Sequence, residues 1–189
     1  MDKNDRKLIA QLQQDGRTTL KELAKTIGLT SMGTKKRLQK MLNQDTIKVS
    51  ALINSASLNL YPAVIMLEME SADAIQNLIS RFKDCPRVIH IFKAIGGYNI
   101  IAFVVAENQS TLESISVEKC SLRSNEGIRR SEFYPIGELY FSPFLQIREH
   151  LAHKEKIQAP CNVDCVSCAR FQTQKCVGCP ATAHYRGPL

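Results

Sequence analysis

Hydrophobic positions in the first fifty residues recur with the three-to-four-residue spacing of amphipathic helices. This pattern predicts short helices in the segments 5–16, 18–28 and 30–44. Gly16 and Gly28 are expected to end the first two helices in the left-handed conformation. Thr19 and Glu22 have the spacing of a capping box. Two helices joined by a tight turn and followed by a basic third helix predict a helix-turn-helix.

The third predicted helix has two different faces. Thr34, Leu38 and Met41 are expected to line its buried face. In a helix-turn-helix the last helix enters the major groove with its N-terminal end, and neighbouring cations bind phosphates. The alternative is a three-helix packing unit with an incidental basic surface. The residues predicted to contact DNA are Thr30, Ser31, Met32, Gly33, Lys35, Lys36, Arg37, Gln39 and Lys40.

From residue 61 onward the pattern becomes rich in strands. Strands are predicted at 61–70, 86–95, 98–106 and 128–140, and helices at 72–84 and 110–122. This β-α-β-β-α-β order is a ferredoxin-like split β-α-β unit with helices on one sheet face. The other face is apolar, so a homodimer or a larger even-numbered oligomer is expected. The predicted fold class is α+β.

Positive charge is concentrated in the predicted helix-turn-helix. The whole chain has a net charge of +7, and residues 1–50 carry eleven Lys/Arg against five Asp/Glu, a net +6. A small basic module attracts the phosphate backbone, so double-stranded DNA is the predicted partner; a merely solvated basic surface is the alternative. The chain has neither a membrane-length apolar run nor a signal-peptide core, so a cytoplasmic protein with no membrane partner is expected.

Cysteines cluster near the C-terminal end of the chain. Two of the seven, Cys85 and Cys120, are expected to be ordinary, partly buried thiols. The other five have the spacing C-x3-C-x2-C-x7-C-x2-C and are Cys161, Cys165, Cys168, Cys176 and Cys179. Thiolates in such a spacing predict either a Zn²⁺ site or a [4Fe–4S] cluster, and the pattern slightly favours the cluster. Reversible disulfide formation without a metal is the alternative.

The first forty residues resemble the opening of the Lrp/AsnC family of transcriptional regulators. The matching parts are Asp5–Ile9, Leu12–Arg17, Glu22–Ala24, Gly28–Leu29 and Arg37–Leu38. The resemblance implies a winged helix-turn-helix followed by the family's second domain, the RAM or AsnC type, which binds effectors and forms oligomers. Thr34 departs from the family's usual Val, and Asp45 with Thr46 departs from its usual turn into a strand at Ile47–Val49.

The resemblance also implies an effector site in the turn between the second and third predicted strands. Gly96, Gly97, Tyr98 and Asn99 are similar to the family's Gly-x-Tyr-Asp signature, with Asn99 in place of the usual Asp. The expected effector is an amino acid or a related small molecule. The alternative is that the two glycines only form a hairpin turn.

These observations predict a three-part chain. Residues 1–53 are the DNA-binding helix-turn-helix, 60–145 the βαββαβ effector and oligomerisation domain, and 155–189 the Cys-rich tail, reached through a polar tether at 149–160. The predicted function is a sequence-specific transcriptional regulator, not an enzyme, modulated by a small effector and by metal or redox state at the tail. The alternatives are an enzyme similar to siroheme decarboxylases, which share this domain pairing, and an architectural DNA-binding protein.

Overall fold

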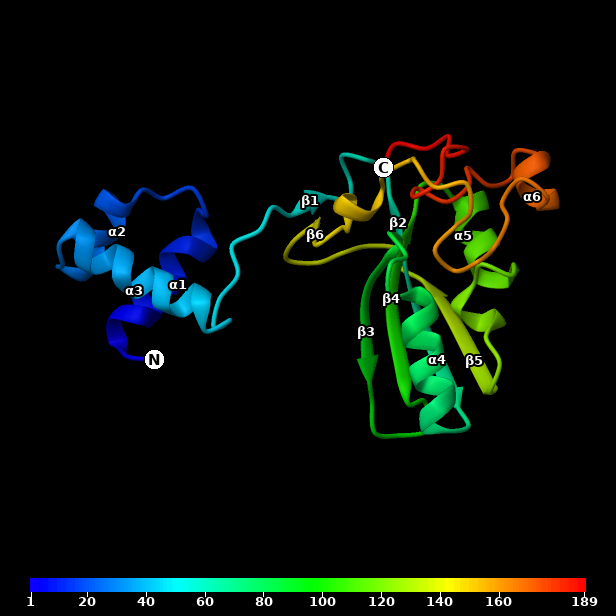
Figure 1. Cartoon of the computed structure of the whole chain (residues 1–189), viewed down its shortest axis with the longest axis horizontal. Helices are drawn as coiled ribbons and strands as arrows, with labels where there is room; N and C mark the ends of the chain where they lie inside the picture. The colour runs from blue at the N-terminus through cyan, green and yellow to red at the C-terminus, as the bar shows by residue number, and fades with distance from the viewer. The chain divides into compact units, whose positions relative to one another are not determined.

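The computed structural model describes all 189 residues, which form two compact units, Met1–Ala51 and Leu52–Leu189. The first unit is helical, and the second combines an antiparallel sheet with helices (Figure 1). The predicted α+β class is therefore confirmed. No helix in the structure is both long and apolar enough to cross a membrane.

The first unit contains the three helices that the hydrophobic spacing predicts. They are α1 (Lys3–Gln14), α2 (Leu20–Ile27) and α3 (Ser31–Asn43). Their shared core consists of Leu8, Leu23, Ile27 and Met41. Because each helix is short, its stability in water comes mainly from this packing and not from helix propensity.

Local capping signals explain most of the helix boundaries in this unit. Thr19 and Glu22 form the predicted capping box, and Gly28 ends α2 with a φ of 69°. The prediction for Gly16 is wrong, because α1 already ends at Gln14 and its C-cap residue is extended. The predicted start of α1 at residue 5 is too late, since Asp2 caps the helix in a second capping box with Asp5.

The strand predicted at Ile47–Val49 is absent. Asp45 has a φ of 51°, and the Thr46 amide donates to the Met41 carbonyl over 2.9 Å, which ends α3 in a left-handed turn. The first unit has no strand that could pair with the extended segment after this turn. The first strand of the chain is instead β1 (Ile53–Asn54), which pairs with β6 (Phe144–Leu145).

The second unit is built on a four-stranded sheet with the order β3-β4-β2-β5, in which all neighbours are antiparallel. The predicted β-α-β-β-α-β order is confirmed. Its elements are β2 (Tyr61–Met69), α4 (Ala72–Phe82), β3 (Val88–Lys93), β4 (Ile100–Ala106), α5 (Gln109–Val117) and β5 (Ile128–Pro135). Short helical turns occur at η1 (Leu122–Ser124), which precedes β5, and at η2 (Glu149–Leu151) and α6 (Ala169–Gln172), which follow it.

The two faces of this sheet differ in how far they are covered. Alternate residues such as Ile65 and Leu67 are buried beneath α4 and α5 in the main core. On the opposite face, Leu60, Ile147 and Leu189 cover one end of the sheet in a smaller core. Elsewhere this face stays open, and Phe92 is 53% exposed. The predicted uncovered face is therefore present over only part of the sheet.

The Cys-rich tail packs into the second unit. Figure 1 shows the tail, in orange and red, at the same end of the sheet as α5. Ala159, Cys161, Cys179 and Ala181 are buried in the same core as the strands and α4. The tail therefore continues the core of the sheet domain, and this continuity places its thiols against the helices.

Candidate DNA-binding helix and thiol-lined cavity

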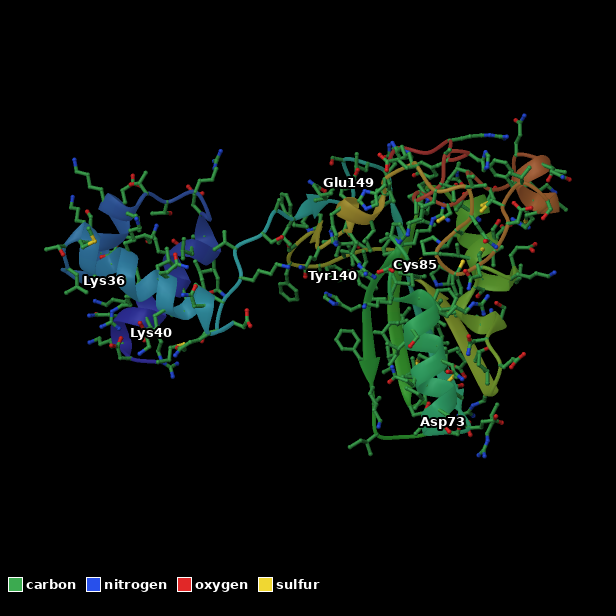
Figure 2. The ribbon with its side chains drawn as sticks, in the orientation of Figure 1. Lys36, Lys40, Asp73, Cys85, Tyr140 and Glu149 are labelled. Atoms are coloured by element: carbon green, nitrogen blue, oxygen red, sulfur yellow. The ribbon has the colours of Figure 1, made fainter.

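The outer face of α3 presents most of the predicted DNA-contacting side chains to solvent. Figure 2 shows Lys36 and Lys40 projecting from this helix. Met32 is 64% exposed. The Thr30 hydroxyl accepts from the Gly33 amide over 3.2 Å, so the start of the helix is capped. The exposed members of the predicted set are Thr30, Ser31, Met32, Lys35, Lys36, Gln39 and Lys40, while Gly33 is half-buried.

Arg37 differs from its neighbours because it is engaged inside the helical unit. Its guanidinium donates to the carboxylates of Asp2, over 2.6 Å, and Asp5, over 2.7 Å. The hydrogen bond from Arg37 is the main reason that the pKa of Asp5 is lowered. Arg37 therefore fastens the start of α1 to α3, a role that its position on a basic helix did not suggest.

All seven cysteines line one cavity in the second unit, with a volume of about 270 Å³. We call it the thiol-lined cavity. Strands β2 and β4 contribute Ile65 and Val104, and helix α4 contributes Phe82. Helix α5 contributes Ile115, and the tail contributes a further wall that includes Phe171. The structure thus brings the five tail cysteines together, although no three His, Cys, Asp or Glu side chains are arranged to hold a single metal ion.

The thiols of the cavity lie in apolar surroundings. Cys161, Cys176 and Cys179 are buried, and the other four are half-buried. Burial, followed by the neighbouring thiols, raises the pKa of Cys165 to about 11. Burial raises the pKa of Cys179 to about 12 in the same way. The protonated thiol is therefore the favoured form in this cavity.

Cys85 and Cys120 were not expected at this cavity. Cys85 lies between α4 and β3, and Cys120 follows α5, so neither belongs to the cysteine spacing of the tail. Figure 2 marks Cys85 within the sheet domain, far along the chain from the tail. The total of seven cysteines was the available hint, and only the docking of the tail brings Cys85 and Cys120 beside its thiols.

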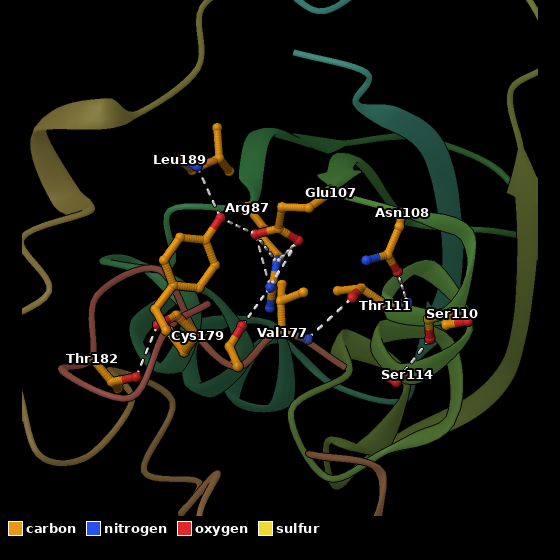
Figure 3. Close-up of polar contacts among 12 residues, drawn as sticks. Arg87, Glu107, Asn108, Ser110, Thr111, Ser114, Val177, Cys179, Thr182 and Leu189 are labelled. Carbon is orange, nitrogen blue, oxygen red and sulfur yellow. Dashed lines mark hydrogen bonds and ion pairs between the residues drawn. The ribbon is translucent and has the colours of Figure 1, made fainter. Parts of the chain in front are cut away.

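A buried ion pair lies next to the cavity and joins the sheet to the tail (Figure 3). The side chains of Arg87 and Glu107 are 8% and 1% exposed, and their closest N–O distance is 2.8 Å. Arg87 also donates to the Gly178 carbonyl, between Cys176 and Cys179. Tyr185 donates its hydroxyl proton to Glu107 over 2.8 Å. Burial opposes the charge on Arg87, but the attraction of Glu107 outweighs it and raises the arginine pKa.

Additional contacts attach the tail to α5. Arg170 donates to the Ser114 hydroxyl over 2.6 Å and pairs with Glu113 over 3.0 Å. The Val177 amide donates to the Thr111 hydroxyl over 3.3 Å. These polar contacts fix the tail beside α5. The segment that follows this helix carries Cys120, which lines the cavity.

The predicted effector turn has a well-defined structure. The Asn99 side chain accepts from the Met69 amide and donates to the Met69 carbonyl, each over 2.8 Å. The Tyr98 hydroxyl donates to Glu132, and Arg130 lies 4.3 Å from the centre of the Tyr98 ring. Gly96 and Gly97 are exposed. Asn99 therefore fixes the turn to β2, while the glycines remain accessible.

Comparisons with known proteins match both units. A family model described as "Winged helix-turn-helix DNA-binding" matches residues 1–48. The chain is 31% identical to the "Uncharacterized HTH-type transcriptional regulator YezC" of Bacillus subtilis, over 60% of this chain and 81% of that one. It is 26% identical to the "Leucine-responsive regulatory protein" of Rhizobium meliloti, over 66% and 83%. These names agree with the prediction of a regulator and not an enzyme.

The fold is also similar to that of a solved regulator. The transcriptional regulator NMB0573 from Neisseria meningitidis, crystallised as a complex with L-Met, superimposes with a TM-score of 0.67 at 21% identity. The similarity covers 74% of this chain and 92% of that one. About a quarter of the present chain therefore has no counterpart in that structure.

The buried ion pair generates a stability prediction. Glu107→Gln leaves the Arg87 charge buried without a counter-charge, so we expect the free energy of unfolding of the second unit to fall by about 3–5 kcal/mol. Glu68→Gln is the matched control, because Glu68 pairs with Arg130 on the exposed surface over 3.6 Å. Its cost should be at most about 1 kcal/mol. Urea unfolding measures both values, and equal losses in the two variants would contradict the assignment.

Proposed function

The chain belongs to the Lrp/AsnC family of helix-turn-helix transcriptional regulators, and on that premise we propose that it recognises specific DNA sequences through α3. The observation that carries the proposal is the outer face of α3, where Lys35, Lys36 and Lys40 are exposed. Arg37 is left out of the contact set because two carboxylates already bind it.

The two kinds of DNA contact come from different parts of α3. Ser31 and Met32 lie exposed at its N-terminal end, the part that enters the major groove and contacts base edges. Lys36 and Lys40 lie one turn apart further along the helix, where cations bind phosphates and supply affinity without specificity. We propose that the chain acts as a dimer or a larger even-numbered oligomer, supported by the open apolar part of the sheet. Two copies of α3 would then contact half-sites about 10 base pairs apart.

The lysines can be tested with a duplex selected from a random-sequence pool. Lys36→Ala with Lys40→Ala should weaken binding to all sequences and reduce the slope of log affinity against log salt by about 2, because each lost phosphate contact accounts for about 1. Lys83→Ala, which removes the charge of an exposed lysine in the second unit, is the control and should leave the slope unchanged. An unaltered slope in the double variant would show that Lys36 and Lys40 do not contact phosphates. A footprint that covers only one half-site would exclude the proposed binding by two copies of α3.

A small effector is proposed for the turn at Gly96–Asn99. The support is the L-Met complex of NMB0573, together with the two exposed glycines of this turn. Because Asn99 stands where the family has Asp and is already bonded to Met69, we propose a ligand that the turn binds through its backbone. Titration of the twenty amino acids should raise the melting temperature and change DNA affinity for one of them. If none does so at millimolar concentration, the amino-acid effector is excluded.

We also propose that the Cys-rich tail is an addition to the family's two domains and that it binds a metal centre. The supporting observation is the convergence of Cys161, Cys165, Cys168, Cys176 and Cys179 on one apolar cavity. An iron–sulfur cluster is preferred to a single Zn²⁺ because the spacing of Cys161, Cys165 and Cys168 is similar to the opening of a [4Fe–4S] loop. When bound, it would let oxidation or iron supply alter the tail.

Metal analysis of anaerobically purified protein tests this centre. We expect about four irons and matching inorganic sulfide per chain, because four thiolates hold a [4Fe–4S] cluster. Removing the cluster should change DNA affinity by at least about 5-fold, the lower end of usual coupling between sites. About one zinc per chain would replace the cluster with a structural ion. If the protein contains neither iron nor zinc at a stoichiometric level, the metal centre is excluded.

A further inference from the structure

The thiol-lined cavity contains more cysteines than the tail alone supplies. Cys85 and Cys120 come from the connections that follow α4 and α5, and both line the cavity together with the tail thiols. Each lies in the main core with Cys161, Cys165 and Cys179. The cavity therefore has sulfur on its domain wall as well as on its tail wall.

The thiols from the two walls belong to one apolar cluster. Cys161 and Cys179 are buried in it, and Cys85, Cys120 and Cys165 pack against it. Cys168 lines the cavity from the start of α6 but does not belong to this cluster. The inner group of thiols therefore mixes domain and tail residues.

The backbone on both sides of this inner group is fixed by hydrogen bonds. The Cys85 carbonyl accepts from Arg148 over 3.2 Å, and its amide donates to the Phe82 carbonyl over 3.1 Å. The Cys161 carbonyl accepts from Arg81 of α4 over 3.4 Å. Both thiols are thus positioned from the C-terminal end of α4 before any metal binds, which lowers the cost of assembling a site.

From these contacts we infer that Cys85 and Cys120 are ligands of the metal centre, so that a thiolate-bound iron–sulfur cluster cross-links the tail to the sheet domain. The inference rests on the metal centre proposed above and names two of its four thiolate ligands, the other two coming from the tail. The cluster would add a covalent cross-link to the existing attachment of the tail. Without it, the tail would remain attached by core packing and by polar contacts such as those of Arg87, Arg170 and Tyr185.

The direct test compares iron and sulfide content in three full-length proteins after anaerobic reconstitution. The double variant Cys85→Ser with Cys120→Ser should retain less than about a quarter of the wild-type iron, because a cluster normally needs all four thiolates. Ser167→Ala, at the rim of the same cavity, is the control and should retain all of it. Wild-type iron and sulfide content in the double variant would overturn the inference.

A second measurement needs no substitution and so does not depend on the variant folding. Hydrogen exchange of the wild-type chain is compared with and without the cluster. Cluster binding should slow amide hydrogen exchange at residues 161–179. It should also slow exchange at 83–88 and 118–122, the segments around Cys85 and Cys120. Protection confined to the tail would overturn the ligand assignment.

The outcomes separate this inference from the proposal on which it rests. If the wild-type chain binds neither iron nor zinc, the metal centre and the ligand assignment fail together. If it binds metal that the double variant retains, only the assignment of Cys85 and Cys120 fails, and the tail thiols alone hold the centre. Regulation of DNA binding by α3 is untouched in both cases.

Discussion

The second unit depends on one buried interaction, the ion pair between Arg87 and Glu107. Two charges at 8% and 1% exposure are costly to bury, and the cost is offset only when every polar atom has a partner. Glu107 satisfies this need through Tyr185, and Arg87 satisfies it through the Gly178 carbonyl. Since both additional partners belong to the tail, the sheet cannot bury this pair without the tail in place. The thiol-lined cavity is a consequence of the same docking.

Much of the fold was predictable because its signals are local. Hydrophobic spacing located the three N-terminal helices, and the Thr19–Glu22 box with Gly28 set the limits of α2. Alternation and helical spacing likewise gave the β-α-β-β-α-β order. The two wrong predictions in the helical unit also have local explanations. Gly16 did not end α1 because Asp15 did so in an extended conformation, and the strand at Ile47–Val49 lacked a partner within its own unit.

The candidate sites likewise combine features that local sequence patterns predict with features that only the fold reveals. The outer face of α3 follows from periodicity, since residues on the side opposite Thr34 and Met41 must face solvent. Arg37 escaped this reasoning because its partners, Asp2 and Asp5, lie more than thirty residues away in sequence. The thiols of the tail share a recognisable spacing, whereas Cys85 and Cys120 join them only through tertiary packing. Spacing within a segment can be seen in a sequence, but contacts between segments require the fold.

The buried and exposed faces of α3 have different roles, and this separation affects how the DNA specificity of such a protein can evolve. Thr34 and Met41 carry the packing of the helical unit, while Ser31, Met32 and Lys35 make no contribution to its core. Surface substitutions of this kind usually alter stability by less than about 0.5 kcal/mol. Duplicated copies of the gene could therefore acquire new operators by drift on the outer face alone, with the architecture retained.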